Sequence, residues 1–149
     1  MTIIRTSSDN SDFQQLAAAL EQELQVRDGE DHAWYAQLNR IDFIEHVLVV
    51  YQQKLPVAIA AIRPYGPGVA EIKRMYVQPG FRKKGIARLV VQELEVWCRQ
   101  LGYSNCVLET GKNQPEAIAL YSSSHYEVVP NFGPYTESAN SVCFKKQLR

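Results

Sequence analysis

The spacing of apolar residues predicts two amphipathic helices in the chain. Apolar side chains recur every three or four residues in 11–26 and again in 85–101, which is the period of a helix with one buried face. The first helix is predicted to bury Phe13, Leu16, Ala17, Leu20 and Leu24. The second is predicted to bury Ile86, Leu89, Val90, Leu94, Trp97, Cys98 and Leu101. Ser11 with Gln14 forms a capping box at the first helix, and Gly102 ends the second.

Runs of β-branched and apolar residues predict the strands. The first run is TIIRTS, and it is followed after the first helix by HVLVVYQQ, PVAIAAIRPY and VAEIKRMYV, which short polar or glycine-containing turns separate. These last three runs predict an antiparallel meander. The segment NCVLET follows the second helix, so we expect it to lie parallel to VAEIKRMYV in the same sheet.

The remaining segments complete a single domain over residues 1–149. The segment DGEDHAWYAQLNR is predicted to be a loop followed by a short helix. Another helix is expected from about Pro115 to Ser123, because proline suits the first turn of a helix. The runs HYEVV and SVCFKKQL are expected to be the last two strands. The predicted class is therefore α/β with a mixed sheet.

A basic, glycine-containing loop, VQPGFRKKGIA, joins VAEIKRMYV to the second helix. Gly80 and Gly85 have the spacing of the nucleoside-triphosphate loop G-x-x-x-x-G-K-[ST]. However, Ile86 and Ala87 replace the lysine and the hydroxyl residue that such loops need for terminal phosphates. The N–H groups at the start of a helix still favour a diphosphate, which this loop would hold and not cleave. Three side chains add positive charge: Arg82, Lys83 and Lys84. The alternative is that these basic groups are only solvated.

Charge and cysteine content disfavour several classes of protein. Lys plus Arg and Asp plus Glu number 16 each, so the chain lacks the overall positive field of a nucleic-acid-binding module or of a protein bound to an acidic membrane. It also lacks the run of about 20 apolar residues that would span a bilayer. Neither Cys98, Cys106 and Cys143 nor the histidines have the spacing of metal ligands, so we expect no metal. No signal-peptide run follows Met1, so we expect a cytoplasmic protein.

The basic loop and a later segment together resemble a known family. VQPGFRKKGIA resembles the acetyl-coenzyme A signature of the GNAT N-acetyltransferases, [RQ]-x-x-G-x-[GA], in which Arg82, Gly85 and Ala87 fill the defining positions. NQPEAIALYSSSHYEVV resembles the second motif of the family, except that His125 stands where glycine is usual. The residues that match the second motif are Asn113, Ala117, Leu120 and Tyr121. The resemblance covers roughly residues 70–129. It implies a GNAT-like mixed sheet of about seven strands with about four helices, splayed between the fourth and fifth strands.

The resemblance implies that acetyl-coenzyme A is the co-substrate. Its pantetheine arm would pair with the backbone at residues 75–77, and its diphosphate would meet the N–H groups of residues 82–87. Glycine at position 85 suits this role, because a Cβ there would hold the diphosphate away from the backbone. The residues expected to contact the coenzyme are Met75, Tyr76, Val77, Arg82, Lys83, Lys84, Gly85, Ile86, Ala87 and Asn113.

Acyl transfer to an amine requires a base for the ammonium group and an acid for the departing thiolate. Glu71 is the predicted base, because a charge in a central strand is costly and so marks a cleft, and because some family members, notably histone acetyltransferases, have a base at the corresponding position. The alternative is that this carboxylate only forms a salt bridge, to Arg63, Lys73 or Arg74. The resemblance implies that Tyr121 is the acid, although it could instead only pack on its helix. The cysteines are predicted to lie in the core, so transfer is expected to be direct.

The expected acceptor is a small amine that also carries a carboxylate, such as an amino-acid-like metabolite. The first helices, the third and fourth strands and the loop VPNFGPYTESANS supply aromatic side chains and two guanidinium groups that suit such a ligand. The predicted acceptor residues are Tyr35, Arg63, Arg74 and Tyr135, with His32, Trp34 and Phe132 in the same region. A protein or peptide acceptor and a non-catalytic acyl-coenzyme A sensor are the alternatives. The sequence leaves open whether the chain forms a homodimer.

Overall fold

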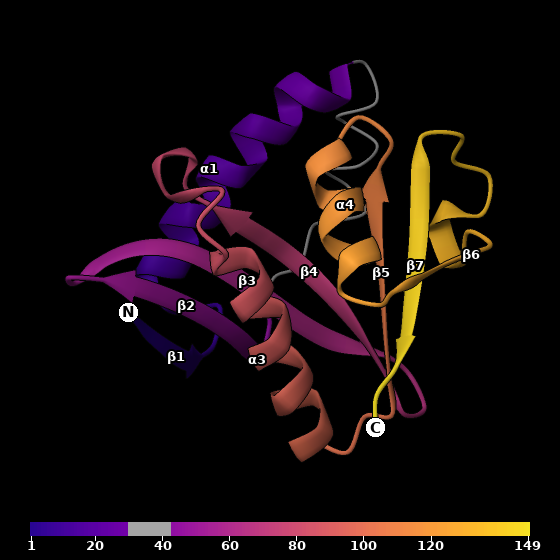
Figure 1. The fold of residues 1–149 in the computed structure, drawn as a ribbon, viewed down its shortest axis with the longest axis horizontal. Coiled ribbons are helices and arrows are strands. Elements are labelled where there is room, and N and C mark those ends of the chain that lie inside the picture. Colours follow the sequence, from indigo (N-terminus) through magenta and orange to yellow (C-terminus); the bar gives the residue numbers. More distant parts are fainter. Residues whose placement is uncertain (30–42) are drawn as a thin grey trace.

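The computed structural model describes residues 1–29 and 43–149, and its strands form one mixed sheet in the order β1-β2-β3-β4-β5-β7-β6 (Figure 1). The seven strands are β1 (Thr2–Thr6), β2 (His46–Gln52), β3 (Leu55–Gly66), β4 (Val69–Val77), β5 (Asn105–Gly111), β6 (Glu127–Val129) and β7 (Ser141–Gln147). The α-helices in the described part are α1 (Ser11–Asp28), α3 (Ile86–Gln100) and α4 (Pro115–Ser123). The α/β class and the seven strands confirm the prediction. The short helix predicted from DGEDHAWYAQLNR lies outside the described residues.

The sheet contains the predicted meander and the predicted opening. Strands β2, β3 and β4 are antiparallel neighbours, and β5 is parallel to β4, as expected for strands joined through the crossover helix α3. The pairing of β4 with β5 covers only three residues of β4, from Val69 to Glu71. Past Glu71 the two strands diverge toward their C-terminal ends (Figure 1). The predicted splay between the fourth and fifth strands is therefore confirmed.

A β-bulge interrupts β4 beside this opening. The pairing of β3 with β4 shifts register between Lys73 and Tyr76, and Arg74 has a φ of 58°. Such a left-handed backbone is uncommon for a residue with a Cβ, and a bulge changes which face the following side chains point to. Ile72 and Val77 are an odd number of residues apart, yet both belong to the same core cluster. A regular strand would place them on opposite faces, so the bulge sets the direction of every side chain in the last part of β4.

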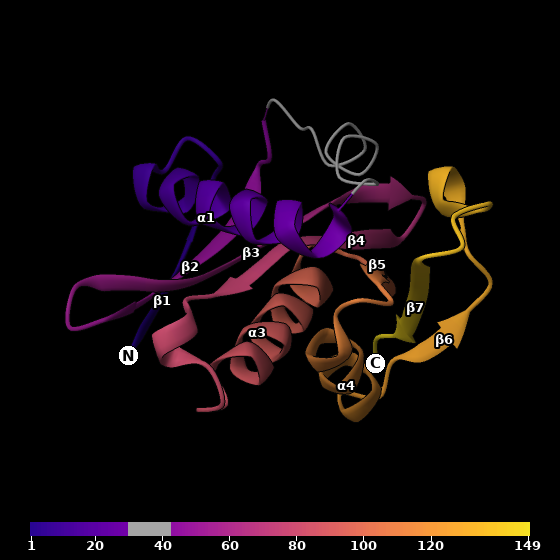
Figure 2. The same cartoon turned by 90° about the horizontal axis from the view of Figure 1, so that it is seen from above.

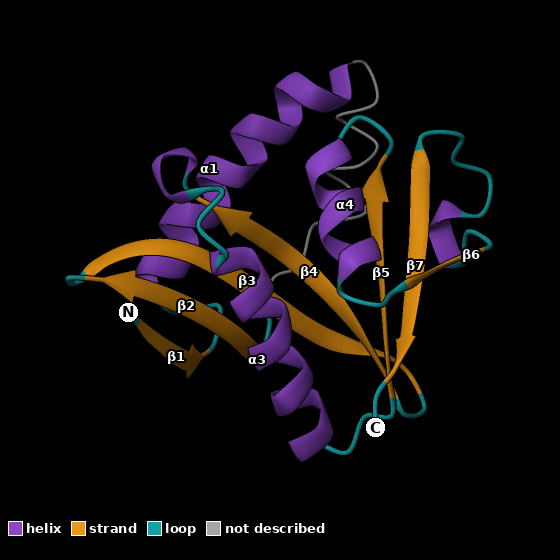
Figure 3. Cartoon of the chain, in the orientation of Figure 1, coloured by secondary structure: helices purple, strands orange, loops and turns teal. Residues whose placement is uncertain are grey.

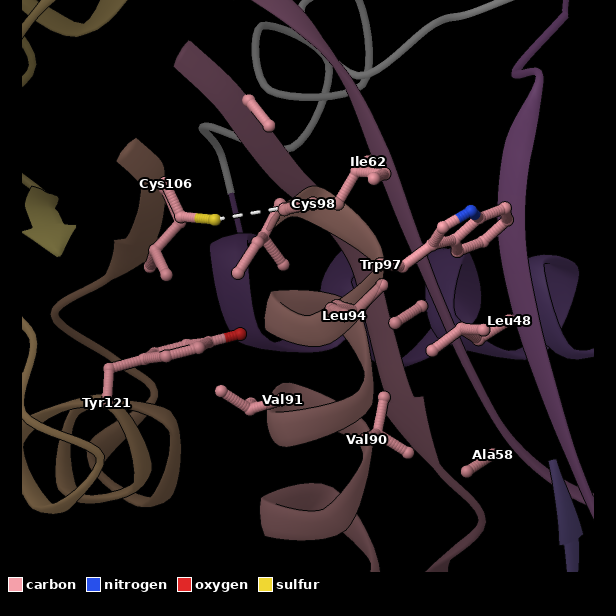
Figure 4. Packing of buried hydrophobic residues seen from close by; sticks show 14 of the residues in the cluster. Leu48, Ala58, Ile62, Val90, Val91, Leu94, Trp97, Cys98, Cys106 and Tyr121 are labelled. Atoms are coloured by element: carbon pink, nitrogen blue, oxygen red, sulfur yellow. Dashed lines mark hydrogen bonds between the residues drawn. The ribbon is translucent and has the colours of Figure 1, made fainter. Parts of the chain in front are cut away.

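Helices cover the two faces of the sheet separately. α1 lies on one face, and α3 and α4 lie on the other (Figure 2). Strand β2 supplies both cores, because Val47 and Val49 pack on the α1 side while Leu48 and Val50 pack on the α3 side. Figure 4 shows Leu48 beside residues of α3. Successive side chains of a strand alternate between faces, so a strand that is covered on both sides has an unbroken apolar run. This is why HVLVVYQQ shows no alternation of apolar and polar residues.

The buried face of α3 differs from the predicted face at two residues. Leu89 and Leu101 are 41% and 40% exposed, whereas Val91 is 1% exposed. The buried stripe is centred on Leu94, and Leu89 lies on the far side of the helix from it, given 3.6 residues per turn. Leu101 follows the last helical residue, Gln100, and so is past the turn that packs on the sheet. The prediction was wrong for these two leucines and is confirmed for the other five residues of the face.

The N-terminal cap of α1 is also one residue earlier than predicted. The side chain of Asn10 accepts a hydrogen bond from the backbone N–H of Phe13 at 2.9 Å, which satisfies one of the free donors at the helix start. Ser11 is already helical. The side chain of Gln14 donates to the carbonyl of Ser8 at 3.0 Å and does not close a capping box with Ser11. The amide of Asn10 therefore replaces the predicted hydroxyl as the cap.

The turn after α4 keeps a left-handed residue although a histidine occupies it. His125 has a φ of 71°, and the next N–H, that of Tyr126, donates to the carbonyl of Tyr121 at 3.0 Å. This is the closure that glycine usually provides at the end of a helix. A left-handed backbone at a residue with a Cβ costs about 1–2 kcal/mol. The turn is retained at the expense of backbone strain.

Replacing His125 tests this strain. We expect His125→Gly to have a free energy of unfolding about 0.5–1 kcal/mol higher than His125→Ala, because glycine relieves the strain while it adds freedom to the unfolded chain. Urea denaturation followed by circular dichroism measures both values. The alanine variant is the control for loss of the imidazole. Equal stabilities of the two variants would show that the turn is not strained.

Candidate functional site

Two adjoining cavities lie at the opening between β4 and β5. The first, which we call the loop cavity, has a volume of about 520 Å³ and is lined by the end of β4, the basic loop, and parts of α1, α3 and α4. The second, which we call the splay cavity, has a volume of about 130 Å³ and is lined by the diverging parts of β4 and β5 with α1 and α4. Five residues line both cavities: Leu20, Met75, Gln114, Ala117 and Leu120. The two cavities are therefore direct neighbours.

The loop cavity brings together most of the residues predicted to contact the coenzyme. The predicted residues that line it are Met75, Tyr76, Val77, Arg82, Lys83, Gly85, Ile86 and Ala87. Lys84 and Asn113 are not among the lining residues. Lys84 places its ammonium 5.6 Å from the centre of the Phe81 ring, and the amide of Asn113 donates to the carbonyl of Arg27 at 3.2 Å.

The backbone of the basic loop leaves the first N–H groups of α3 without a side-chain cap. A 3-10 turn at Pro79–Phe81 follows β4, and Gly85 has a φ of 82° immediately before the helix begins at Ile86 (Figure 3). A Cβ built at Gly85 would meet no heavy atom of the described residues within 4 Å. The glycine therefore serves the left-handed turn and keeps the cavity open, and it is not needed for packing against the protein. Uncapped N–H groups at a helix start suit an anionic ligand.

Arg82 is already held by three groups of the protein. Its Nε donates to the carbonyl of Val77 at 2.8 Å, and its Nη2 lies 2.7 Å from Oε1 of Glu23 on α1. The guanidinium carbon is 5.5 Å from the centre of the Tyr76 ring. Glu23 lines the loop cavity together with Arg82. A carboxylate thus lies beside the cation that the sequence assigns to a diphosphate.

Glu71 reaches the splay cavity but is engaged in salt bridges. Its side chain is 2% exposed, and its Oε1 accepts a hydrogen bond from Nε of Arg63 at 2.9 Å. Its Oε2 lies 3.7 Å from Nζ of Lys73. Arg63 stands directly opposite Glu71 on β3, so the pairing follows from the register of the sheet. The ion pairs that were the structural alternative for Glu71 are present, and they involve the same carboxylate that lines the cavity.

Glu109 is a carboxylate of the splay cavity that the sequence reasoning missed. It lies on β5, and its Oε2 accepts a hydrogen bond of 2.6 Å from the hydroxyl of Ser141 on β7. Burial raises the pKa of Glu109 to about 7 in spite of that hydrogen bond. The signal in the sequence was a glutamate inside the strand NCVLETG. A charge in a central strand is costly and so marks a cleft, which is the argument that was applied to Glu71.

Tyr121 lies where the second motif predicts it. It is 4% exposed, lines the splay cavity, and packs edge-on against the ring of Tyr126 with centroids 5.6 Å apart. Figure 4 shows its hydroxyl directed away from α4. Burial raises the pKa of Tyr121. The phenol is protonated at neutral pH, as an ordinary phenol is, and its burial makes it a weaker acid than in water.

The predicted acceptor residues are only partly brought together. Arg74 and Tyr135 line the splay cavity, whereas Arg63 is not among its lining residues. Arg74 also lies 3.6 Å from Glu21. Phe132 packs edge-on against Tyr135, with ring centroids 5.9 Å apart. Tyr35, His32 and Trp34 lie outside the described residues.

A buried lysine was missed as a residue of the acceptor side. Lys73 lines the splay cavity, its side chain is 5% exposed, and its Nζ donates to the hydroxyl of Tyr135 at 3.4 Å. Burial lowers the pKa of Lys73, and the charge of Glu71 opposes that shift. Its partners are at 3.4 and 3.7 Å, which are long for charge-assisted hydrogen bonds. A ligand anion could approach this ammonium more closely than its present partners do.

The three cysteines lie in the core of the protein. Cys98, Cys106 and Cys143 are all buried and free, as predicted, and the sulfur atoms of the first two are 3.6 Å apart (Figure 4). Among residues 1–29 and 43–149, no group of three His, Cys, Asp or Glu side chains is arranged to hold a metal ion. None of the described helices is long and apolar enough to cross a membrane.

Known proteins match both the sequence and the fold. The model of the acetyltransferase (GNAT) family matches residues 12–126. An IAA acetyltransferase of Azospirillum brasilense is 38% identical over 81 residues, which cover 54% of this chain and 53% of that protein. The chain thus spans about half the length of this curated relative.

Solved structures extend the similarity over the whole chain. A Klebsiella pneumoniae protein described as an acyl-CoA N-acyltransferase is 28% identical, with a TM-score of 0.82 and coverage of 99% of this chain and 97% of that chain. A GNAT family acetyltransferase of Elizabethkingia anophelis, solved with acetyl-CoA bound, is 14% identical, with a TM-score of 0.69 and coverage of 99% and 97%, and it shows a common fold. Because the family model covers most of the chain and the sheet has the splay expected for this family, the chain belongs to the GNAT acetyltransferase family.

Proposed function

We propose that the chain is an N-acetyltransferase that moves the acetyl group of acetyl-coenzyme A directly to a small amine carrying a carboxylate. The observation that carries the proposal is the pair of adjoining cavities, one beside the uncapped start of α3 and the other lined by Glu109, Lys73 and Tyr121. The bound acetyl-CoA in the Elizabethkingia anophelis structure supports the choice of co-substrate.

The loop cavity fits coenzyme A in its charge and its backbone. The N–H groups at the start of α3 would hold the diphosphate, with Lys83 and Arg82 adding positive charge. The end of β4 does not pair with β5. Its backbone at residues 75–77 can therefore pair with the extended pantetheine arm. Met75 lines both cavities, so an arm that follows β4 delivers the thioester to the splay cavity.

Glu109 is the better placed of the two carboxylates to act as the base. An acceptor ammonium of pKa about 10 must lose a proton before the nitrogen can attack the thioester carbon. Glu71 is neutralised by Arg63 and Lys73, which must move before it can accept that proton. Glu109 has one neutral donor, Ser141, and a pKa of about 7, so it exchanges protons readily at neutral pH. Glu71 remains the alternative base.

Tyr121 would complete the reaction from the opposite side of the cavity. The amine nitrogen forms a bond to the acetyl carbon, the carbon–sulfur bond breaks, and the phenol protonates the departing thiolate. The second proton that the nitrogen loses as the amide forms restores the phenol. The phenol of Tyr121 is protonated at neutral pH, as phenols ordinarily are, and it lines the cavity in which the thiolate would form. It is therefore placed to make this contact.

The splay cavity also fits the proposed acceptor. Its volume of about 130 Å³ suits a small ligand, and it presents carboxylates and an ammonium close together. An amine that also carries a carboxylate would place its nitrogen at Glu109 and its anion at Lys73, with Tyr135 and Arg74 beside it. The first alternative is transfer to a peptide acceptor. The second is a protein that binds acyl-coenzyme A without transferring the acyl group.

Removal of the Tyr121 hydroxyl tests the acid. We expect Tyr121→Phe to lower kcat by roughly 10²–10⁴-fold, the usual contribution of a positioned acid, while the Kd of coenzyme A changes less than twofold. Steady-state kinetics and calorimetry measure the two quantities. Tyr126→Phe, which removes the hydroxyl of the adjacent ring, is the matched control. Wild-type kcat in Tyr121→Phe would exclude the phenol as the acid.

The pH profile tells the two candidate bases apart. A base must be deprotonated to act, so with a pKa of about 7 for Glu109 we expect kcat/KM to rise between about pH 6 and pH 8 and then to level off, apart from the acceptor's own ionisation. Glu109→Gln should lose this rise and lower kcat at least roughly 100-fold. Glu71→Gln should keep the rise. The reverse pattern would assign the base to Glu71.

A panel of amines tests the acceptor and the function together. We expect transfer to amino-acid-like amines and weaker transfer to matched amines that lack the carboxylate. Lys73→Met should raise KM roughly tenfold for the carboxylated amine alone, because it removes one charge-assisted hydrogen bond. Transfer confined to peptides would contradict the small-molecule acceptor, and coenzyme binding without transfer to any amine would favour the sensor. Thermal denaturation of Lys73→Met controls for folding.

A further inference from the structure

The C-terminal half of α1 is tied to both walls of the loop cavity. Glu23 pairs with Arg82 of the basic loop, and Arg27 pairs with Glu116 at the start of α4. The amide of Asn113 adds a hydrogen bond to the carbonyl of Arg27. α1 and α4 lie on opposite faces of the sheet (Figure 2), and the pair between Arg27 and Glu116 joins them. The helix therefore bridges the cavity in which the coenzyme is proposed to bind.

The Glu23–Arg82 pair opposes the proposed ligand in two ways. Both side chains line the loop cavity, and they are 29% and 30% exposed, so a ligand can reach them. Arg82 cannot direct the same N–H to Glu23 and to a diphosphate at once, since each guanidinium N–H points in a fixed direction. The carboxylate of Glu23 also repels an anion that approaches the loop.

The other contacts of Arg82 do not compete with a diphosphate. The Nε of Arg82 donates to the carbonyl of Val77, and the guanidinium carbon lies over the ring of Tyr76. These contacts fix the position of the guanidinium while Nη2 points to Glu23 at 2.7 Å. Exchange of one carboxylate for a phosphate oxygen at Nη2 would leave Arg82 in place. Glu23 is thus the partner that a ligand can replace.

We propose that Glu23 is a built-in competitor of the coenzyme, which the diphosphate displaces from Arg82 when it binds. The inference rests on the proposed coenzyme site. Displacement removes the ion pair between Glu23 and Arg82 and leaves the pair between Arg27 and Glu116. Because Leu24 and Asp28 of the same helix line the splay cavity, release of Glu23 connects coenzyme binding to the acceptor side.

Calorimetric titration with coenzyme A tests the competition. We expect Glu23→Gln to lower the Kd roughly three- to tenfold, because the amide neither holds Arg82 as an ion pair nor repels the diphosphate. Glu21→Gln is the matched control: it removes the same charge from the same helix, but Glu21 pairs with Arg74 and lines neither cavity. Its Kd should stay within twofold of the wild-type value. The gain from Glu23→Gln should shrink as salt rises from 20 to 500 mM, roughly as screening of exposed charges requires.

A double-mutant cycle separates displacement from simple repulsion. In an Arg82→Gln background, Glu23→Gln should lower the Kd by a clearly smaller factor than in the wild-type background, because the ion pair no longer exists and only the repulsion of the diphosphate remains. The same tightening in both backgrounds would show that Glu23 acts only through its charge and would overturn the displacement. An unchanged or weaker affinity of Glu23→Gln would overturn the competition itself and assign Glu23 to the orientation of Arg82. In either case binding by the wild-type chain would keep the proposed function, whereas a wild-type chain that binds no coenzyme A would overturn both.

Discussion

The early end of the pairing between β4 and β5 is the constraint on which the rest of the site depends. The two strands share three residue pairs and then part, although each keeps its other neighbour in the sheet. Backbone groups at the end of β4 consequently have no strand on one side, and buried backbone groups need partners. The opening gives them access to an extended ligand. The same opening lets Tyr121 from one face and α1 from the other line a common cavity.

The two carboxylates beside the opening of the sheet have different hydrogen-bond and ion-pair partners. Glu71 and Glu109 lie on neighbouring strands and line one cavity. Glu71 faces two cations at close range, whereas Glu109 accepts a hydrogen bond from a neutral hydroxyl, and its partial burial raises its pKa to about 7. Two carboxylates with distinct environments can take different roles in one reaction, one holding cations and the other exchanging a proton.

The elements that could be predicted are those whose signals are local. The period of apolar residues found α1 and α3, and the crossover rule gave the direction of β5, because both depend on neighbouring positions or on chain connectivity. The predicted cap of α1 and the predicted buried face of α3 were partly wrong, because local geometry selects among adjacent residues. Asn10 caps α1 because its amide reaches the N–H of Phe13, and Leu89 is exposed because the stripe centres on Leu94.

The candidate site also has a part that depends on local sequence and a part that depends on residues distant in the chain. The basic loop and Tyr121 lie in contiguous motifs, so the sequence by itself determined them, together with the order of the elements and the family they resemble. Only the tertiary structure decided which carboxylate is paired with cations and which has a neutral hydrogen-bond donor. Arg63 meets Glu71 through the register of β3 with β4, and Ser141 meets Glu109 through that of β5 with β7. Ionisation depends on every group within a few ångströms, and those groups come from strands that are distant in the chain.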